Sequence, residues 1–282
     1  MYAARRRPFS GDVLLSNNLL AIYPLWDDAE DTAVEQVLPG PHGDGVASVN
    51  TDLLFAVGKV GAACRFMGTQ YITLPTALAA RVSGGSAFSI AFIVKPVTFV
   101  TDRILVGNTD TTRGIYVKIK SDQTVEFGLM DTAKSRKITS VSTLTADQWA
   151  FVVATYDGSA TDAGLKLYIN SASEGATVAA STWPTTATND LFLGGRTSGA
   201  VHFYANAAIE HVMFYGTAIS QDTVDEIYND GDGVRYNESK ENYFNNHPTL
   251  WVGLRNSWLS YIRTNCRKIF CARQVFCVFL QV

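Results

Sequence analysis

Between Phe88 and Tyr215, apolar side chains recur at every second position, and this alternation constrains the fold more than any other feature of the sequence. A period of two is typical of β-strands with one buried face, because successive side chains of a strand point to opposite sides. Turn signals such as Asp157-Gly158 and Gly194-Gly195 separate the apolar runs. The pattern predicts strands near residues 88–94, 115–119, 125–129, 149–156, 165–169, 191–193 and 209–215.

A helical pattern is expected at only one place, near residues 220–229. Ser220 suits the N-cap position. An apolar stripe with i, i+3, i+4 spacing follows, formed by Val224, Ile227 and Tyr228. Because no helical pattern lies between the strands, the sheets are expected to be antiparallel. The predicted fold is therefore an all-β, antiparallel β-sandwich of the jelly-roll type with one short helix.

Charge divides the chain into a body and a tail. Residues 237–282 hold six Lys and Arg against two Asp and Glu, whereas residues 1–236 hold 17 against 24. A body this acidic is poorly suited to nucleic-acid backbones, so no nucleic-acid partner is expected. We expect an N-terminal arm over 1–11, a jelly-roll domain over 12–236 and a basic, aromatic tail over 237–282.

The tail has two interpretations. Four of its apolar residues are spaced to line one face of a helix: Trp251, Leu254, Trp258 and Tyr261. A basic amphipathic helix of this kind suits contact with an anionic membrane surface or a partner protein. Alternatively, the abrupt change in composition indicates a segment that is not a functional part of the domain.

The N-terminus lacks the pattern of a signal peptide. Arg5, Arg6 and Arg7 are followed by Pro8 and Ser10, not by an apolar stretch of about 7–15 residues. Nor does the sequence contain an apolar run of about 18 residues, the length that crosses a membrane. We therefore expect synthesis in the cytoplasm, and display on a virion or on a cell surface stays open.

Several longer motifs occur in a fixed order along the chain. They include CRFMGTQYITLP (64–75), AFSIAFIVKP (87–96), DQWAFVVATYDGS (147–159), GLKLYINS (164–171) and LFLGGR (191–196). AAIEHVMFYGTAIS (207–220) and EIYNDGDGVRY (226–236) complete the order. From about Leu19 to Tyr236, this order resembles the laminin-G-like domains of the concanavalin A-like lectins and glucanases. The resemblance implies a concanavalin A-like jelly roll over this span.

Calcium is the metal that the resemblance suggests. Relatives often carry it at the rim, where the strand-entry motif offers acidic or amide oxygens. Here the corresponding places hold Met67, Thr69 and Gln70. Asp44 and Asp157 remain as oxygen ligands, but both also suit ordinary turns. We therefore expect no cofactor, with calcium as the alternative.

Sugar binding requires an aromatic ring beside polar groups, because a pyranose has an apolar face and polar edges. Five residues at outward-facing strand positions or in loops are candidates: Tyr116, Trp183, Arg196, His202 and Tyr204. For Trp183, packing over a sheet edge is the alternative. His211 alternates with Ile209 and Met213 and is instead expected in the core.

Three classes of function compete. The leading hypothesis is a non-catalytic recognition module that binds carbohydrate or a protein surface through loop residues. The second is a structural, decoration or fibre protein of a virus or phage particle, which would form homo-oligomers. The third is a glycoside hydrolase, which needs two carboxyl groups on one strand face, spaced as in Glu-x-Asp-x-x-Glu. The sequence has no such pattern, so an enzyme is not expected.

Overall fold

The structure is a computed structural model. It describes residues 18–27, 30–34, 36, 43–82, 85–108, 113–131, 134–178, 190–195, 197–198, 201–202 and 204–233. The chain divides into two compact units, Met1–Arg235 and Tyr236–Val282, and every described residue belongs to the first. The arm expected over 1–11 and the tail expected over 237–282 lie outside the described residues.

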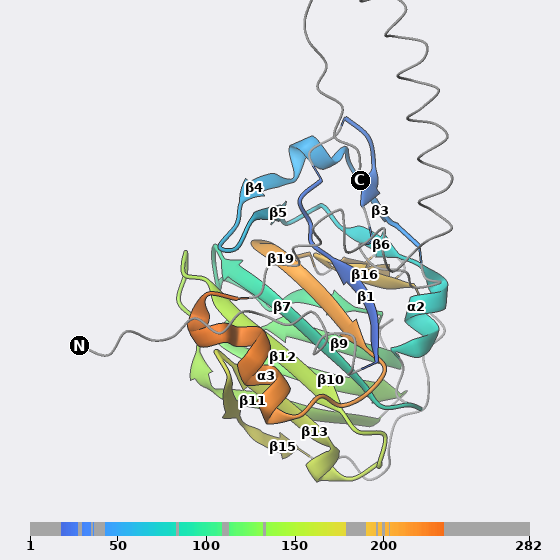
Figure 1. The fold of residues 1–282 in the computed structure, drawn as a ribbon, viewed down its shortest axis with the longest axis vertical. Helices are drawn as coiled ribbons and strands as arrows, with labels where there is room; N and C mark the ends of the chain where they lie inside the picture. The colour runs from blue at the N-terminus through green and yellow to red at the C-terminus, as the bar shows by residue number, and fades with distance from the viewer. Residues whose placement is uncertain are drawn as a thin grey trace, which may run out of the picture. The chain divides into compact units, whose positions relative to one another are not determined.

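Two antiparallel sheets form the described unit (Figure 1). The eight-stranded sheet runs in the order β14 (Ala172–Glu174), β13 (Leu165–Ile169), β12 (Ala150–Tyr156), β7 (Phe88–Pro96), β19 (Asn206–Tyr215), β5 (Ala62–Met67) and β4 (Phe55–Val57). Its eighth strand, β1 (Leu19–Tyr23), pairs with β19. The expected antiparallel jelly-roll sandwich is confirmed.

The nine-stranded sheet lies behind the first in Figure 1. Its order is β15 (Ala176–Val178), β11 (Lys134–Thr143), β10 (Thr124–Asp131), β9 (Arg113–Ile119), β8 (Arg103–Gly107), β16 (Leu191–Leu193), β6 (Ile72–Leu74), β3 (Gly45–Ala47) and β2 (Ala33–Val34). A separate hairpin joins β17 (Thr197–Ser198) to β18 (Val201–His202).

The core lies between the two sheets and follows the period of two. On β9, Ile115, Val117 and Ile119 point into it. Phe88 of β7 meets Phe127 of β10 edge to face, with ring centroids 6.0 Å apart. Apolar burial at about 25 cal/mol per Å² makes this layer the main stabilising contribution.

The helices are short: α2 (Thr76–Arg81), α3 (Gln221–Tyr228) and the 3₁₀ turns η1 (Thr51–Leu53), η2 (Asp162–Gly164) and η3 (Asn229–Gly231). The helix expected near 220–229 is confirmed as α3. It lies on the outer face of the eight-stranded sheet, where Tyr228 contacts Phe151 with ring centroids 5.9 Å apart. Helix α2 was not predicted from the sequence, because six residues are too few to show a helical period. None of the helices in the described part is long and apolar enough to cross a membrane.

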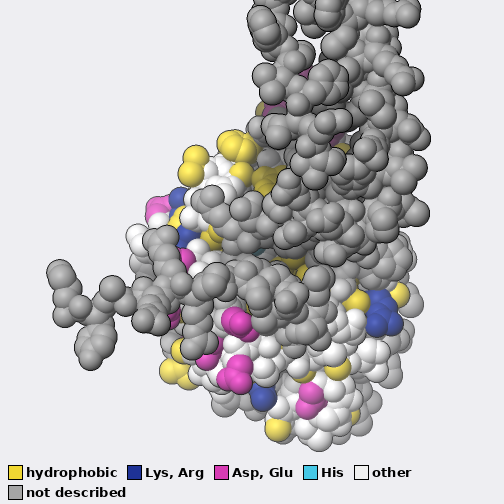
Figure 2. All heavy atoms as spheres, in the orientation of Figure 1, with side chains coloured by type: hydrophobic (Ala, Val, Ile, Leu, Met, Phe, Trp, Pro, Cys, Tyr) yellow, Lys and Arg dark blue, Asp and Glu magenta, His cyan; other side chains and the backbone are white. Residues whose placement is uncertain are grey.

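Acidic side chains gather on the side of the molecule that carries α3, as Figure 2 shows. Asp222, Asp225 and Glu226 are all exposed on this helix. The side chain of Asp222 lies in the first turn, where the positive end of the helix dipole stabilises a carboxylate.

The start of α3 provides a stability test. The Ser220 hydroxyl oxygen accepts a hydrogen bond from the Thr223 N–H at 3.3 Å and so caps the helix. Ser220→Ala should lower the free energy of unfolding by about 1 kcal/mol, as loss of a serine cap typically does. Urea denaturation measures this change, and Ser121→Ala in an exposed turn is the control. Equal effects of the two variants would show that the cap contributes nothing.

A bulge in β19 corrects the expectation for His211. This residue is buried as expected, but it has a φ of +50° at a register shift between Glu210 and Met213. The inserted residue moves the alternation by one position. Ile209 therefore faces the core between the sheets together with Val212, while Met213 is also buried but lies outside that core cluster. The expectation that Ile209, His211 and Met213 share one face was wrong.

Candidate functional site

The nine-stranded sheet directs a straight row of residues away from the core. Strand pairing aligns Thr73, Phe192, Gly107, Tyr116, Gly128 and Lys137 across six adjacent strands. The chain neighbours of Phe192, Leu191 and Leu193, belong to the core instead. Because alternate residues of a strand share a face, this row lies on the outer face of the sheet.

Three aromatic rings meet at one end of this row, and we call Tyr71, Phe192 and Tyr204 the aromatic cluster. The rings of Tyr71 and Tyr204 are stacked nearly parallel, at 9°, with centroids 5.9 Å apart. Phe192 meets Tyr71 edge to face at 5.6 Å. Tyr71 and Tyr204 are half-buried, whereas Phe192 is only 8% exposed. Phe192 thus supports a pair of rings that remain accessible.

Backbone hydrogen bonds hold Tyr204 beside this sheet. The N–H of Ala205 donates to the Gly194 carbonyl, and the N–H of Gly194 donates to the Leu105 carbonyl, each at 2.7 Å. Gly194 has a φ of +76°, and a Cβ there would lie 2.2 Å from the Phe66 ring. Only glycine therefore fits this connection. Partial burial, followed by proximity to Tyr71, raises the pKa of Tyr204.

Farther along the row, Glu126 gathers polar partners, and we call Tyr116, Lys118, Glu126, Lys137 and Thr139 the Glu126 cluster. The Tyr116 hydroxyl donates to Oε1 of Glu126 at 2.8 Å. The ammonium groups of Lys118 and Lys137 lie 3.1 and 3.4 Å from the carboxylate oxygens. The Thr139 hydroxyl donates to Oε2 at 3.3 Å. Both oxygens of this buried carboxylate therefore have partners on the neighbouring strands β9 and β11.

The ionisation of Glu126 follows from these contacts. Burial by itself disfavours the charged form, but the Tyr116 hydrogen bond and the two lysines outweigh it and lower the pKa of Glu126. Asp102, 3.0 Å from the other side of Lys118, also has a lowered pKa, because Lys118 and the Ser121 N–H outweigh its desolvation. Neither carboxyl group resembles the general acid of a glycosidase, whose pKa must be raised.

The five residues that the sequence suggested for sugar binding have different outcomes in the structure. Tyr204 lies in the aromatic cluster. Tyr116 points away from the core as expected, but it is only 7% exposed, because its ring lies over Gly128, where a Cβ would come within 2.4 Å of it. The prediction that Tyr116 is accessible to a ligand was therefore wrong. His202 belongs to β18, paired with Thr197, and its side chain lies outside the described part.

Trp183 and Arg196 also lie outside the described residues, so the structure does not place them. The sequence-based candidates did not include Tyr71, Phe192, Lys118 and Glu126, which also belong to this face. Phe192 lies between two core leucines and Tyr71 precedes the core residue Ile72. Because both rings are next to core residues in a strand pattern, alternation could have identified them as outward-facing.

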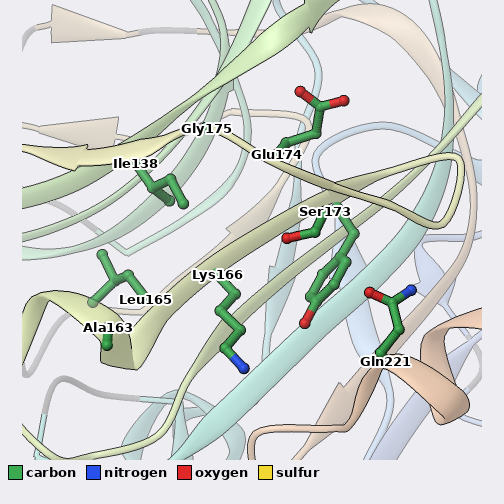
Figure 3. Close-up of a pocket in the computed structure, with 9 residues that line it drawn as sticks. Ile138, Ala163, Leu165, Lys166, Ser173, Glu174, Gly175 and Gln221 are labelled. Carbon is green, nitrogen blue, oxygen red and sulfur yellow. The ribbon is translucent and has the colours of Figure 1, made fainter.

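A cavity of about 310 Å³ opens elsewhere, at the edge of the sandwich near the start of α3 (Figure 3). Lys166, Ser173 and Gln221 supply polar groups to its lining. The Glu174 carboxylate in the lining accepts hydrogen bonds from the N–H groups of Val141 and Ser142, each at 2.9 Å. Its single lining aromatic residue, Tyr168, is only 3% exposed. The cavity therefore lacks an aromatic surface for a sugar ring.

The oxygens proposed for calcium have other partners. The carboxylate of Asp157 accepts from the Ser159 N–H at 2.8 Å, and that of Asp44 accepts from the Gln36 N–H at 2.9 Å. The side-chain oxygen of Gln70 accepts from the Met67 N–H at 2.8 Å. Among the residues that the structure describes, no three His, Cys, Asp or Glu side chains gather as a metal site would require.

Comparison with known families identifies the fold family. The family model of the concanavalin A-like lectin/glucanases superfamily matches residues 66–225, more than half of the chain. The chain belongs to this superfamily. No curated protein matches it.

Solved structures share the fold of this superfamily member at low sequence identity. Domain 4 of AbnA, a GH43 extracellular arabinanase from Geobacillus stearothermophilus solved with arabinotriose, is 19% identical with a TM-score of 0.57; the match covers 77% of this chain and 98% of that domain. The binding domain of Paraclostridial Mosquitocidal Protein 1 is 14% identical, with a TM-score of 0.57 and coverage of 76% and 52%. Trypanosoma rangeli sialidase in complex with sialic acid is 13% identical, with a TM-score of 0.53 and coverage of 77% and 34%.

Proposed function

We propose that the protein is a non-catalytic carbohydrate-binding module that binds an oligosaccharide on the outer face of the nine-stranded sheet. The observation that carries this proposal is the parallel, half-buried pair of Tyr71 and Tyr204. The apolar face of a sugar ring packs on such an aromatic surface, while its hydroxyl groups need polar partners nearby. Phe192 fixes the orientation of Tyr71 before any ligand arrives.

The Glu126 cluster supplies polar partners on the same face. Tyr116 lies two strands from Phe192 in the aligned row, which corresponds to about 10 Å at the usual strand spacing. The side chain of Lys137 is 38% exposed, so its ammonium group can donate to a hydroxyl or carboxylate of a ligand. A ligand that contacts both clusters is therefore longer than one sugar unit.

One further observation supports carbohydrate binding, and another supports the absence of cleavage. The arabinanase domain that shares this fold was solved in complex with arabinotriose. Two carboxyl groups of the proposed face, Asp102 and Glu126, have lowered pKa values, whereas hydrolysis needs a proton donor. The alternative of a virus or phage structural protein gains no support from the relatives.

A glycan array of the full chain, followed by calorimetric titration of the best ligand, tests the proposal. Tyr204→Ala should weaken binding about tenfold or more, because it removes one ring of the stacked pair. Tyr204→Phe, which keeps the ring, should bind nearly as well as the unmodified chain. Lys166→Ala, in the separate cavity, is the matched control and should leave the affinity unchanged.

Each other result has a definite meaning. Loss of binding in Lys166→Ala but not in Tyr204→Ala would show that the ligand binds in the cavity and not on the aromatic cluster. A blank array from folded protein would reject the carbohydrate ligand, and shortened products after incubation with the ligand would reject the absence of catalysis. Sensitivity of binding to EDTA would establish a metal requirement.

A further inference from the structure

The edge strand β4 has one unpaired side. On its other side it pairs with β5, where the N–H of Gly58 donates to the Gly61 carbonyl at 3.0 Å and the N–H of Arg65 donates to the Leu54 carbonyl at 2.6 Å. Hydrogen-bonding positions alternate along an antiparallel strand. The backbone groups of Phe55 and Val57 therefore point away from β5, and no described strand lies beyond them.

Large apolar side chains accompany this free edge. Leu53, Phe55 and Val57 are 64%, 46% and 80% exposed, at alternate positions of the chain. Figure 2 shows hydrophobic side chains gathered over β4, at the upper left of the molecule. Natural edge strands are usually protected by a lysine, a proline, a bulge or a covering segment. The sequence Phe55-Ala56-Val57 contains neither a lysine nor a proline, and its pairing with β5 shows no bulge.

The opposite end of the same sheet is protected. There the chain passes from β14 through Gly175 into β15, which belongs to the other sheet. The Glu174 carboxylate meanwhile accepts hydrogen bonds from the Val141 and Ser142 N–H groups of β11. Strand β1 also has a single described partner, β19, but its residues from Leu20 to Tyr23 are buried. Among the described strands of this sheet, β4 is therefore the exposed edge that can accept a partner.

We propose that the partner is a second copy of this chain, paired antiparallel through β4 with Phe55 of each copy opposite Val57 of the other. Phe55 and Val57 carry the outward backbone groups, so this register forms a hydrogen-bonded pair on each side of a two-fold axis at Ala56. The exposed apolar side chains of the two copies then cover each other. This interface is separate from the aromatic cluster and is independent of the proposed function.

Charge at the ends of the strand favours self-pairing. Asp52 precedes β4 and Lys59 follows it, and both side chains are exposed. Antiparallel pairing through β4 brings the start of one copy's strand to the end of the other's, so Asp52 in the 3₁₀ turn η1 comes near Lys59 of the second copy. Each end of the paired strands therefore brings opposite charges together, as an unrelated peptide would do only by coincidence.

Sedimentation equilibrium of the full chain over a range of concentrations tests the proposal. The full chain should form a dimer, and Val57→Lys should weaken self-association about tenfold or more, because it places a charge in the paired edge. Val141→Lys is the matched control, since Val141 is 82% exposed on the other sheet. Asp52→Lys and Lys59→Asp should each weaken the dimer, and the double variant should restore it.

A chain that stays monomeric, or a dimer that is equally insensitive to Val57→Lys and Val141→Lys, overturns the proposal. If Val57→Lys does not fold, hydrogen exchange of the unmodified chain decides the matter. The amides of Phe55 and Val57 should become more protected as the protein concentration rises. Exchange at these amides that is independent of concentration also overturns the proposal.

Discussion

Glu210→Ala should lower the free energy of unfolding by about 4 kcal/mol, which is among the largest effects expected of any single substitution outside the aromatic core. The Glu210 side chain is fully buried, and its carboxylate accepts hydrogen bonds from three successive backbone N–H groups. These belong to Lys59 at 2.6 Å, Val60 at 2.9 Å and Gly61 at 2.5 Å. Removing the carboxylate leaves three donors without a partner in the turn between β4 and β5.

Conservative and neutral variants separate the hydrogen bonds from simple loss of volume. Glu210→Gln keeps the shape but replaces one acceptor by an amide N–H that opposes the backbone donors, so about half of the effect should remain. Glu226→Ala, on the exposed face of α3, should change stability by less than about 0.5 kcal/mol. Urea denaturation of all three variants provides the comparison. A Glu210→Ala variant as stable as Glu226→Ala would mean that water replaces the carboxylate in the turn.

Gly58 explains why this turn accepts a carboxylate at all. A Cβ at Gly58 would lie 2.5 Å from Oε2 of Glu210, so only glycine leaves room for the carboxylate at that distance from the chain. The Nδ1 atom of His211 lies 3.3 Å from Oε1 of the same carboxylate. The bulge in β19 lies between two paired segments of the strand, because β5 pairs with residues 206–209 and β1 with residues 212–215.

Each of the seven ranges predicted from alternation contains a strand, because alternation is a local property. However, β8 and the ten-residue β11 lie within the same stretch of sequence and were not predicted. The sequence could not predict the bulge at His211, since residues on both faces of β19 are buried and an inserted residue leaves no mark in the pattern. It also missed α2, where only Leu78 and Ala79 are buried over six residues. The spacing of apolar residues shows which side of a strand faces the core. The same spacing reveals a helix only when the helix has several turns.

The accessibility of Tyr116 illustrates a second limit. Alternation correctly indicated that its side chain leaves the core, but exposure depends on the adjacent strands. Gly128 on β10 has no side chain to hold the ring upright, so the Tyr116 hydroxyl reaches Glu126 and the ring becomes buried. The aromatic cluster depends on topology in the same way: Tyr71 and Tyr204 are distant in sequence and meet because β6 lies beside β16.

Acidification should destabilise the protein through Glu126, and Glu126→Gln should remove that part of the pH dependence. The pKa of Glu126 is lower in the folded protein than its ordinary value of 4.5, so more protons bind to the unfolded state. The stabilisation by the ionised carboxylate is therefore complete above about pH 4.5 and is lost as the pH falls through the lower pKa of the folded state. At neutral pH we expect Glu126→Gln to cost about 3 kcal/mol, because two lysines lose their buried partner.

Denaturation of both proteins between neutral and acidic pH measures this effect. The difference in stability between the unmodified chain and Glu126→Gln should shrink steadily once the pH drops below the ordinary glutamate value. Asp122→Asn is a suitable control, because Asp122 also has a lowered pKa, caused by Lys120 and Thr124, but its ion pair is exposed and contributes little. A constant difference across the whole range would show that the carboxylate acts through its shape and not through its charge.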